Sequence, residues 1–405
     1  MRFVSACSAL RTPLSIALLA SVLPMTAHAI GGCTLDGNPI DLSNGSTTAG
    51  KTGMIHCTDR DGLPQRDIEL RNGVQMGTMR YFQKGILQKE FTTNARGNQD
   101  GLSRTFAATP GPKNQVLREE TRKNGDTVGV VRNWYPDGTL QRLGYRLDNG
   151  TEAAVAGFTA KGRLSDLRCF TQPVFAPDFD DATSCGFRKG PVTVDLYSPR
   201  ELLAAHVAYD RGERRQIENL WENGKPQQVV ELGTTAGTEN DFTEDGVKRK
   251  SLAWVVQPGD GAGKPGRRVL TLQQDYHESG ALIRERHWTP TDRGASLVLD
   301  ESWYLNGQLK DKDDYFAQDG QPTKRSTTYH DNGKVATVGL WLTKGEDDDH
   351  EIGVHQSFDA DGRLRGESIY DARGRATRER ALDETGKVLR DDQVFEDGSR
   401  KAFAK

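Results

Sequence analysis

The chain has 405 residues, of which 35% are apolar and 44 are glycine, and its mean hydropathy is −0.68. Its 54 basic and 57 acidic residues give a net charge of −3, which excludes a strongly basic nucleic-acid-binding protein. After residue 29 there is no stretch of 18 or more apolar residues, so no membrane-spanning helix is expected there. The composition predicts a thin core with many turns, and we find no convincing catalytic site.

Residues 1–29 have the features of a secretory signal peptide. Arg2 and Arg11 accompany an apolar run from Leu14 to Met25, and Ala27-His28-Ala29 ends the segment. A positive start, a short apolar middle and an Ala-x-Ala end are typical of a cleaved leader. We therefore expect a periplasmic or secreted protein with cleavage near Ala29. The mature chain would carry 52 basic and 57 acidic residues, a net charge of −5.

Four cysteines remain after cleavage: Cys33, Cys57, Cys169 and Cys185. An even number of cysteines in an exported chain favours two disulfides. Four cysteines allow three connectivities, and proximity favours Cys33–Cys57 and Cys169–Cys185, each worth about 3 kcal/mol by chain entropy. Ile30-Gly31-Gly32-Cys33 is also tolerable as a lipoprotein cleavage box. Because lipidation of Cys33 would leave three thiols, we favour the disulfides.

A short repeat runs through most of the chain: an aromatic residue, two or three polar residues, a glycine, any residue and an aliphatic residue. At the C-terminal end the glycines are 12 residues apart, as in Tyr370-Asp-Ala-Arg-Gly374-Arg-Ala376. Glycine and Asn-Gly or Asp-Gly pairs supply the positive φ angles of tight hairpin turns. The predicted turn glycines are Gly85, Gly138, Gly162, Gly224, Gly246, Gly280, Gly307, Gly333, Gly362, Gly374, Gly386 and Gly398.

The spacing between these turns predicts an all-β fold, an elongated antiparallel meander of β-hairpins. About eight residues separate one turn from the next aromatic residue, which suits one strand. Leu364 and Tyr370 are six residues apart, so they share a face of their strand. Charged side chains lie between such apolar ends and are expected to pair across strands: Arg365, Glu367, Arg378 and Arg380.

At these residues the chain resembles the MORN repeat family, in the bacterial variant whose units read Tyr-x-x-Asn-Gly-x-Leu. It looks like the bacterial proteins described as YwqK-family antitoxins. The resemblance covers roughly residues 70–165 and 205–405, and Trp221 and Phe395 depart from it by standing three residues before their glycines. MORN-type repeats generally bind or scaffold other molecules, so the resemblance implies a role without catalysis.

The repeat suggests five segments. Residues 1–29 are the signal peptide, 30–69 a disulfide-bonded N-terminal cap, 70–165 a first repeat array, 166–203 a disulfide-pinned insertion and 204–405 a second array. Within the insertion, Ser198-Pro199-Arg200-Glu201 has the form of a helix start, although a strand from Leu202 to Tyr209 is the alternative. Residues 259–266 are a glycine-rich connector.

Several motifs match catalytic or metal-binding patterns without their context. Residues 45–52 fit the phosphate-loop pattern, but no buried strand precedes them and no helix follows. The acidic run from Glu346 to Glu351 could hold a cation, yet such runs are more often solvated loops. His277 and His287 are predicted at opposite ends of a strand, which argues against a shared zinc site. We therefore expect no catalytic residue, no metal and no cofactor.

The leading functional hypothesis is an exported antitoxin or immunity-type protein that neutralises a toxin by protein–protein binding. Aromatic residues dominate binding hot spots, and the candidates are Tyr304, Tyr329, Phe358 and Tyr370, although ordinary sheet packing explains any single one. The alternative is a cell-envelope scaffold that contacts a membrane surface or a polysaccharide. The net charge gives no sign of the basic face that anionic lipids require. An enzyme is the third hypothesis, and no spaced acid/base set supports it.

Overall fold

The computed structural model describes residues 31–108, 115–259, 266–343 and 349–403. The predicted signal peptide therefore lies outside the described residues. Almost every element is a β-strand, and the strands fall into two antiparallel sheets, of 12 and 17 strands. The all-β class and the antiparallel hairpin meander are confirmed. Two compact units divide between Thr127 and Val128, and each is described by itself below.

In the first unit, sequence neighbours from β3 to β8 pair in chain order, and the β1–β2 hairpin joins through β1 beside β3. A single-turn 3₁₀ helix, η1 (Gly45–Thr47), lies between β2 and β3. The strands are β1 (Gly32–Leu35), β2 (Asn38–Ile40), β3 (Gly53–Thr58), β4 (Pro64–Arg71), β5 (Val74–Gln83), β6 (Ile86–Thr93), β7 (Gln99–Phe106) and β8 (Val116–Lys123).

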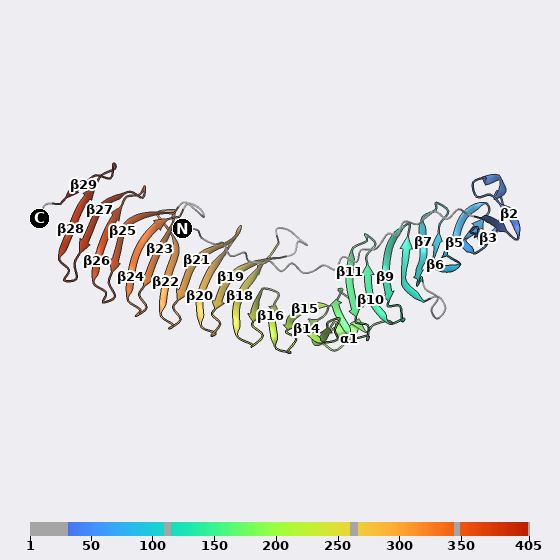
Figure 1. Cartoon of the computed structure of the whole chain (residues 1–405), viewed down its shortest axis with the longest axis horizontal. Helices are drawn as coiled ribbons and strands as arrows, with labels where there is room; N and C mark the ends of the chain where they lie inside the picture. The colour runs from blue at the N-terminus through green and yellow to red at the C-terminus, as the bar shows by residue number, and fades with distance from the viewer. Residues whose placement is uncertain (1–30, 109–114, 260–265, 344–348, 404–405) are drawn as a thin grey trace. The chain divides into compact units, whose positions relative to one another are not determined.

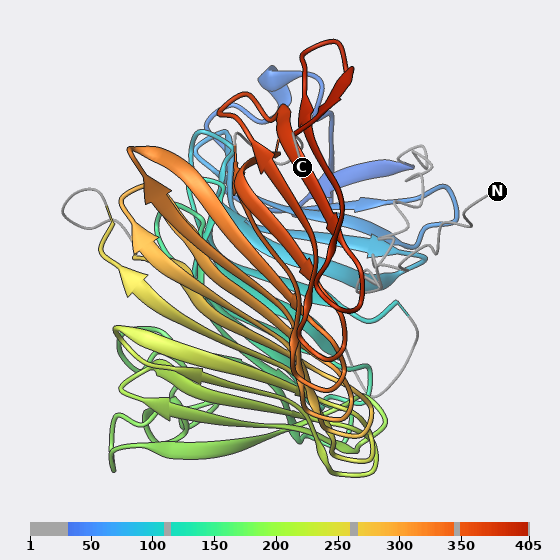
Figure 2. The same ribbon diagram turned by 90° about the vertical axis from the view of Figure 1, so that its left-hand side faces the viewer.

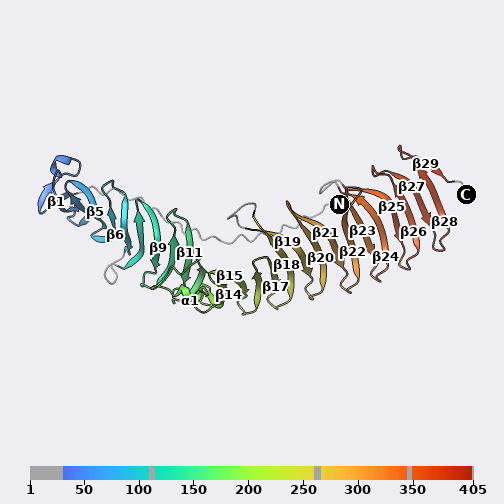
Figure 3. The same ribbon diagram turned by 180° about the vertical axis from the view of Figure 1, so that it is seen from behind.

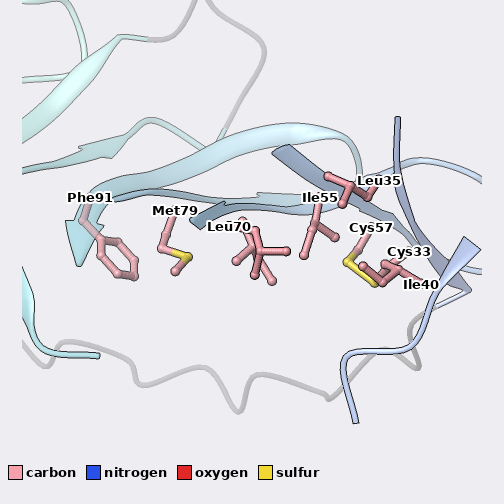
Figure 4. Close-up of a cluster of buried hydrophobic side chains, with 9 residues drawn as sticks. Cys33, Leu35, Ile40, Ile55, Cys57, Leu70, Met79 and Phe91 are labelled. Atoms are coloured by element: carbon pink, nitrogen blue, oxygen red, sulfur yellow. A yellow bond between two sulfur atoms is a disulfide. The ribbon is translucent and has the colours of Figure 1, made fainter. Parts of the chain in front are cut away.

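The predicted N-terminal cap is part of this sheet. Its boundary at residue 69 falls inside β4, which pairs with β5 along its length. The disulfide Cys33–Cys57 joins β1 to β3 across directly opposed residues, as predicted. Both sulfurs belong to an apolar cluster on one face of the sheet (Figure 4), whose buried members are Cys33, Leu35, Ile40, Ile55, Cys57, Ile68, Leu70, Met79 and Phe91.

The opposite face of the first unit carries a row of alternating charges. Neighbouring strands place these side chains directly opposite one another, because the register pairs each with the next: His56, Asp67, Arg80, Glu90, Arg104 and Glu119. The shortest ion pairs are Arg80 Nε–Glu90 Oε2 at 2.7 Å and Arg104 Nε–Glu119 Oε2 at 2.8 Å. Exposed pairs of this kind contribute roughly 0.2–1 kcal/mol each, so the row specifies register more than it adds stability.

One carboxylate of this unit is buried on the apolar face. Glu120 is 5% exposed and accepts hydrogen bonds from Arg118 Nη2 at 2.6 Å and Arg122 Nε at 2.9 Å. Burial opposes ionisation of this carboxyl, but the hydrogen bonds and charges of Arg118 and Arg122 outweigh it and lower the pKa below its ordinary 4.5. The ionised form therefore stabilises the folded state.

This pairing predicts an acid-sensitive first unit. A carboxyl whose folded pKa lies below the unfolded value contributes stability above the unfolded pKa, and loses that contribution as pH falls through the folded pKa. We expect Glu120→Gln to lower the free energy of unfolding at pH 7 by about 1–2 kcal/mol, because two arginines lose their charged acceptor. The variant should also show a flatter dependence of stability on pH below 4.5. Urea unfolding at several pH values measures both effects, and parallel pH profiles would contradict the assignment.

The second unit begins inside β9, and it contains β10 to β12 and the whole 17-stranded sheet, in which β13 to β29 follow one another in chain order (Figures 1 and 3). β18 and β19 pair antiparallel, and most of the predicted glycine-rich connector between them, residues 260–265, lies outside the described residues. The elements are β9 (Asp126–Trp134), β10 (Leu140–Arg146), β11 (Glu152–Phe158), β12 (Leu164–Arg168), α1 (Asp181–Ser184), β13 (Val192–Tyr197), β14 (Leu203–Asp210), β15 (Glu213–Leu220), β16 (Pro226–Leu232), β17 (Ala236–Phe242), β18 (Lys248–Gln257), β19 (Arg267–Tyr276), β20 (Leu282–Thr291), β21 (Gly294–Trp303), β22 (Leu309–Gln318), β23 (Gln321–Tyr329), β24 (Val335–Leu342), β25 (His350–Phe358), β26 (Leu364–Tyr370), β27 (Ala376–Leu382), β28 (Val388–Val394) and β29 (Arg400–Ala402).

The main core of this unit lies around the insertion. The disulfide Cys169–Cys185 closes a 16-residue separation, as predicted, and Cys185 is 1% exposed. Tyr209 of β14 is also 1% exposed, and its hydroxyl donates to the Leu167 carbonyl of β12. The insertion is shorter than the predicted 166–203, because β12 ends at Arg168 and β13 begins at Val192. Its core members are Leu143, Ala154, Ala156, Leu167, Phe175, Cys185, Ala205, Val207 and Tyr209.

Beyond this core the 17-stranded sheet is a single layer. From Glu213 to Ala402, the buried side chains of the described residues are Val230, Trp254, Val269 and Thr323. Cross-strand contacts therefore hold the layer, and the predicted charge pairs occur: Arg378 Nη2 lies 2.7 Å from Asp391 Oδ2, and Arg380 Nη1 lies 3.7 Å from Glu367 Oε1. Arg365 Nη1 pairs with Asp359 Oδ2 at 3.9 Å. Among the described residues, both faces of this sheet are therefore at least partly exposed to solvent.

Candidate binding surface

The repeated motif forms one kind of hairpin turn. In the unit Asp371-Ala-Arg-Gly374-Arg375, the Asp371 N–H donates to the Arg375 carbonyl and the Gly374 N–H donates to the Asp371 carbonyl. The glycine has φ +78°, and a register shift follows in the strand pair, as in a three-residue hairpin loop with a glycine bulge. All twelve predicted turn glycines have positive φ, and all except Gly85 share these two bonds. Lys84-Gly85 instead forms a two-residue turn in which both φ angles are positive.

The segment expected to start a helix is another copy of this turn. Ser198 and Glu201 make the same two backbone hydrogen bonds, and Glu201 takes the glycine position with φ +65°. The helix prediction was therefore wrong, and the alternative strand is present as β14. Arg163 Nε binds Glu201 Oε2 at 2.7 Å, and a second nitrogen of Arg163 donates to the Glu201 carbonyl. This clamp holds a residue that would otherwise avoid the left-handed region.

Hairpin turns follow one another along one edge of the 17-stranded sheet (Figure 2), and side chains of the motif join successive turns there. The aromatic residue that opens a turn donates to the chain just before the next turn, as Trp221 Nε1 does to the Phe242 carbonyl and Tyr304 Oη to the Tyr329 carbonyl. Asparagines two residues further on do the same between turns: Asn223 to Glu244, Asn306 to Asp331 and Asn332 to Ala360, at 2.7–2.8 Å. The side chains of the motif thus link successive hairpins by hydrogen bonds.

The positions of the four predicted binding residues follow from this stacking of turns. Tyr304 lies in a turn, and Tyr329 and Phe358 end β23 and β25 at the same edge, where their carbonyls accept bonds from the preceding turns. Tyr370 ends β26 at the opposite edge, because Gly353 rather than Phe358 faces it in β25. The four residues do not form one surface, and only Tyr370 remains part of the aromatic group described next.

Three half-buried rings of neighbouring strands form an aromatic strip: Trp341 of β24, His355 of β25 and Tyr370 of β26. The imidazole lies edge-on to both neighbours, with ring centroids 4.5 Å from Trp341 and 4.8 Å from Tyr370. Lys324 Nζ lies 5.5 Å from the Trp341 ring centroid and 3.2 Å from Asp349 Oδ2. Such rings present a large and rigid contact area, and the strip lies on an open sheet face.

Carboxylates lie near Tyr370 of the strip and near Tyr315 of β22, and Lys324 lies among them. Burial raises the pKa of Tyr315 to about 12, and the nearby carboxylates of Asp313, Asp300 and Asp349 add to the shift. The pKa of Tyr370 is also raised, first by burial and then by Glu351. Both phenols are therefore neutral at physiological pH, with carboxylates nearby. A partner that docks here must tolerate or use this negative charge.

A glycine inside β24 creates room for the strip. A Cβ atom on Gly339 would lie 2.5 Å from His355 Nδ1, and His355 Nε2 lies 2.8 Å from the Leu340 carbonyl. Sequence reasoning missed Trp341 and His355, although a glycine within a predicted strand signals a bulge or a close approach. Cross-strand neighbours of this kind depend on register rather than on a local motif.

Gly339→Ala should therefore displace the imidazole. We expect a loss of about 1–2 kcal/mol from overpacking, together with a changed near-ultraviolet circular dichroism signal from Trp341 and Tyr370. In a His355→Ala background the same substitution should cost less, because the obstructing ring is gone. Equal costs in the two backgrounds would show that His355 does not cover Gly339.

The remaining motifs do not assemble a site. Residues 45–52 contain η1 and lead directly into β3, so the helix that a phosphate loop requires does not follow. Of the acidic run, residues 346–348 lie outside the described part, and Asp349 pairs with Lys324. His287 Nε2 lies 2.6 Å from Glu285 Oε1, whereas His277 caps its own turn through Ser279. Within the described ranges, no group of three or more His, Cys, Asp or Glu side chains could hold a metal ion.

The described part of the chain contains no helix with the length and apolar character needed to cross a membrane.

Comparison with known proteins adds little. No family model matches the chain, and no curated protein matches it. One similar solved structure is described as "Crystal Structure of TcdB2-TccC3-Cdc42"; it matches at 12% identity and a TM-score of 0.17 over 88% of this chain. The match covers 20% of that chain, so the present chain spans about a fifth of its length. A TM-score this low supports no conclusion about fold or function.

Proposed function

We propose that this chain is an exported β-repeat binding protein of the MORN type, and specifically an antitoxin or immunity-type protein that neutralises a toxin by binding it. The observation that carries the proposal is the aromatic strip of Trp341, His355 and Tyr370 on an open face of a single-layer sheet. Two disulfides favour an oxidising compartment outside the cytoplasm. The resemblance to YwqK-family antitoxins supports the choice of a toxin as the partner.

The strip favours a protein partner for physical reasons. Aromatic side chains that are already ordered lose little entropy on binding, so they contribute more affinity than flexible chains. The carboxylates near Tyr315 and Tyr370 would complement a basic patch on the toxin and speed association. Binding would then weaken as ionic strength rises.

The test is to export the products of neighbouring genes to the periplasm of a bacterial host, to find one that arrests growth, and to ask whether this chain protects the host from it. The wild-type chain should restore growth, and Trp341→Ala should bind the purified toxin at least about tenfold more weakly, as expected for a hot-spot ring. Val354→Ala is the matched control, because Val354 is 46% exposed and neighbours His355 in the strand, so it faces the other side of the sheet. Wild-type affinity in Trp341→Ala would remove the strip from the interface.

Failure of the wild-type chain to protect would contradict the antitoxin role itself. Sedimentation with anionic liposomes separates that role from the envelope-scaffold alternative. Binding to such vesicles that disappears at high salt would favour the scaffold.

A further inference from the structure

A hollow of about 340 Å³ opens on the 17-stranded sheet, away from the aromatic strip. It lies where β15, β16 and β17 meet the turn that Trp221 opens. Its volume is at the lower end of the range of small-molecule sites, about 300–1,000 Å³, which suits a ligand the size of one ring. Six residues line it: Asn219, Trp221, Gln227, Gln228, Asp241 and Phe242.

Polar side chains in this hollow are held in place by one another. Asn219, Gln228 and Asp241 stand directly opposite one another on three neighbouring strands. Asn219 Nδ2 donates to Gln228 Oε1 at 3.2 Å, and Gln228 Nε2 donates to Asp241 Oδ1 at 3.1 Å and to Glu239 Oε1 at 3.0 Å. These bonds leave the amide oxygen of Asn219 and the second carboxylate oxygen of Asp241 as oriented acceptors.

The apolar side of the hollow is also fixed. Trp221 Nε1 donates to the Phe242 carbonyl at 3.2 Å, so the indole ring cannot rotate freely. The ring is half-buried and supplies a flat apolar surface beside the acceptors. A ligand that fits must therefore offer an apolar face and, at its rim, hydroxyl or amide donors.

We propose that this hollow binds a neutral pyranose unit of a glycan. A pyranose has a face of C–H groups that can lie on the Trp221 ring, and its equatorial hydroxyls can donate to Asn219 and Asp241. Among the groups next to the hollow, Glu239 is acidic and Lys250 stands opposite Asp241 in β18, but no lining residue is basic, so a phosphorylated or carboxylated ligand would find no cation inside the hollow. This site is separate from the aromatic strip, so either can fail without the other.

Another repeat provides a natural comparison. Tyr304 opens its turn as Trp221 does, and the three opposed positions beside it hold the shorter side chains Ser302, Asp311 and Thr328. The Ser302 hydroxyl donates a hydrogen bond to Asp311 Oδ2 at 2.7 Å, so this pair is hydrogen-bonded without the amide side chains found at the hollow. Tyr304→Ala and Asp311→Asn are therefore matched controls for changes at the hollow.

The experiment is isothermal titration of the mature chain with cellotetraose, maltotetraose, chitotetraose and, as the charged comparison, tetragalacturonate. We expect at least one neutral oligosaccharide to bind and tetragalacturonate not to bind. Trp221→Ala should abolish that binding, and Asn219→Ala and Asp241→Asn should each weaken it about tenfold, the effect of one lost hydrogen bond to a charged or oriented group. The two control variants should bind as the wild type does.

Thermal melts of each variant separate lost binding from lost folding, and Asp241→Asn is the decisive variant because it preserves shape. The proposal is overturned if no neutral oligosaccharide binds, if tetragalacturonate binds equally well, or if folded Asp241→Asn and Asn219→Ala keep wild-type affinity.

Discussion

Gly212→Ala is expected to destabilise the second unit by about 2–5 kcal/mol. Gly212 has φ +84° in the Arg211-Gly212 turn between β14 and β15, a conformation that costs an L-residue about 1–2 kcal/mol. A Cβ there would also lie 2.3 Å from the Phe170 carbonyl oxygen and 2.8 Å from Phe187 Cζ. Because the first obstacle is backbone, the insertion must shift, which adds about 1–3 kcal/mol. Urea unfolding followed by circular dichroism measures the loss.

Gly320→Ala is the matched control for this substitution. Asp319-Gly320 forms the same two-residue turn with φ +75° at the glycine, but a Cβ there would meet nothing within 4 Å. We expect only the conformational cost, about 1–2 kcal/mol. If the two variants lose equal stability, the insertion does not pack against the β14–β15 turn.

Removal of the Cys169–Cys185 disulfide is the second change with a large expected effect. The bond closes a separation of 16 residues, and the double variant Cys169→Ser and Cys185→Ser should lose about 3 kcal/mol. Cys185 is 1% exposed, so the new hydroxyl is also buried. Hydrogen exchange should rise in residues 170–191 and in β13 and β14, which share their core.

The array from β20 to β28 should keep its protection in that variant. Each strand of this single layer contacts its sequence neighbours, so damage at one end need not spread. Loss of protection across all strands of the 17-stranded sheet would show instead that the unit unfolds as one cooperative body. A reductant added to the wild-type chain should reproduce this pattern in the second unit, while it also opens Cys33–Cys57 in the first unit.

Local chain chemistry was sufficient to predict much of this fold. Glycine is the residue that most readily adopts positive φ, so its position alone indicates a tight turn. Eleven repeat turns and the turn at Gly85 were placed correctly in this way. The strand between Leu364 and Tyr370 follows from the turns that bound it. Both disulfides were predicted from short sequence separations, which keep loop closure inexpensive.

The prediction was wrong at a turn that has no glycine and whose Ser-Pro pair is also typical of a helix start. A Ser-Pro pair begins a helix in many proteins. Here Ser198-Pro199 begins a turn, because Arg163, 38 residues before Glu201, holds Glu201 at positive φ. The aromatic residues were also misread as one surface. Whether an aromatic residue stands three or four positions before the glycine decides whether it opens the turn, as Tyr304 does, or ends the strand, as Tyr370 does.

The sequence by itself determined the all-β repeat, its turns and its two cysteine pairs, because each depends on residues close together in the chain. Only the tertiary structure decided which side chains meet across strands. Trp341, His355 and Tyr370 are separated by 14 and 15 residues and come together through the register and the space above Gly339. Register is a property of strand pairs, since a shift of one residue sends every side chain to the opposite face.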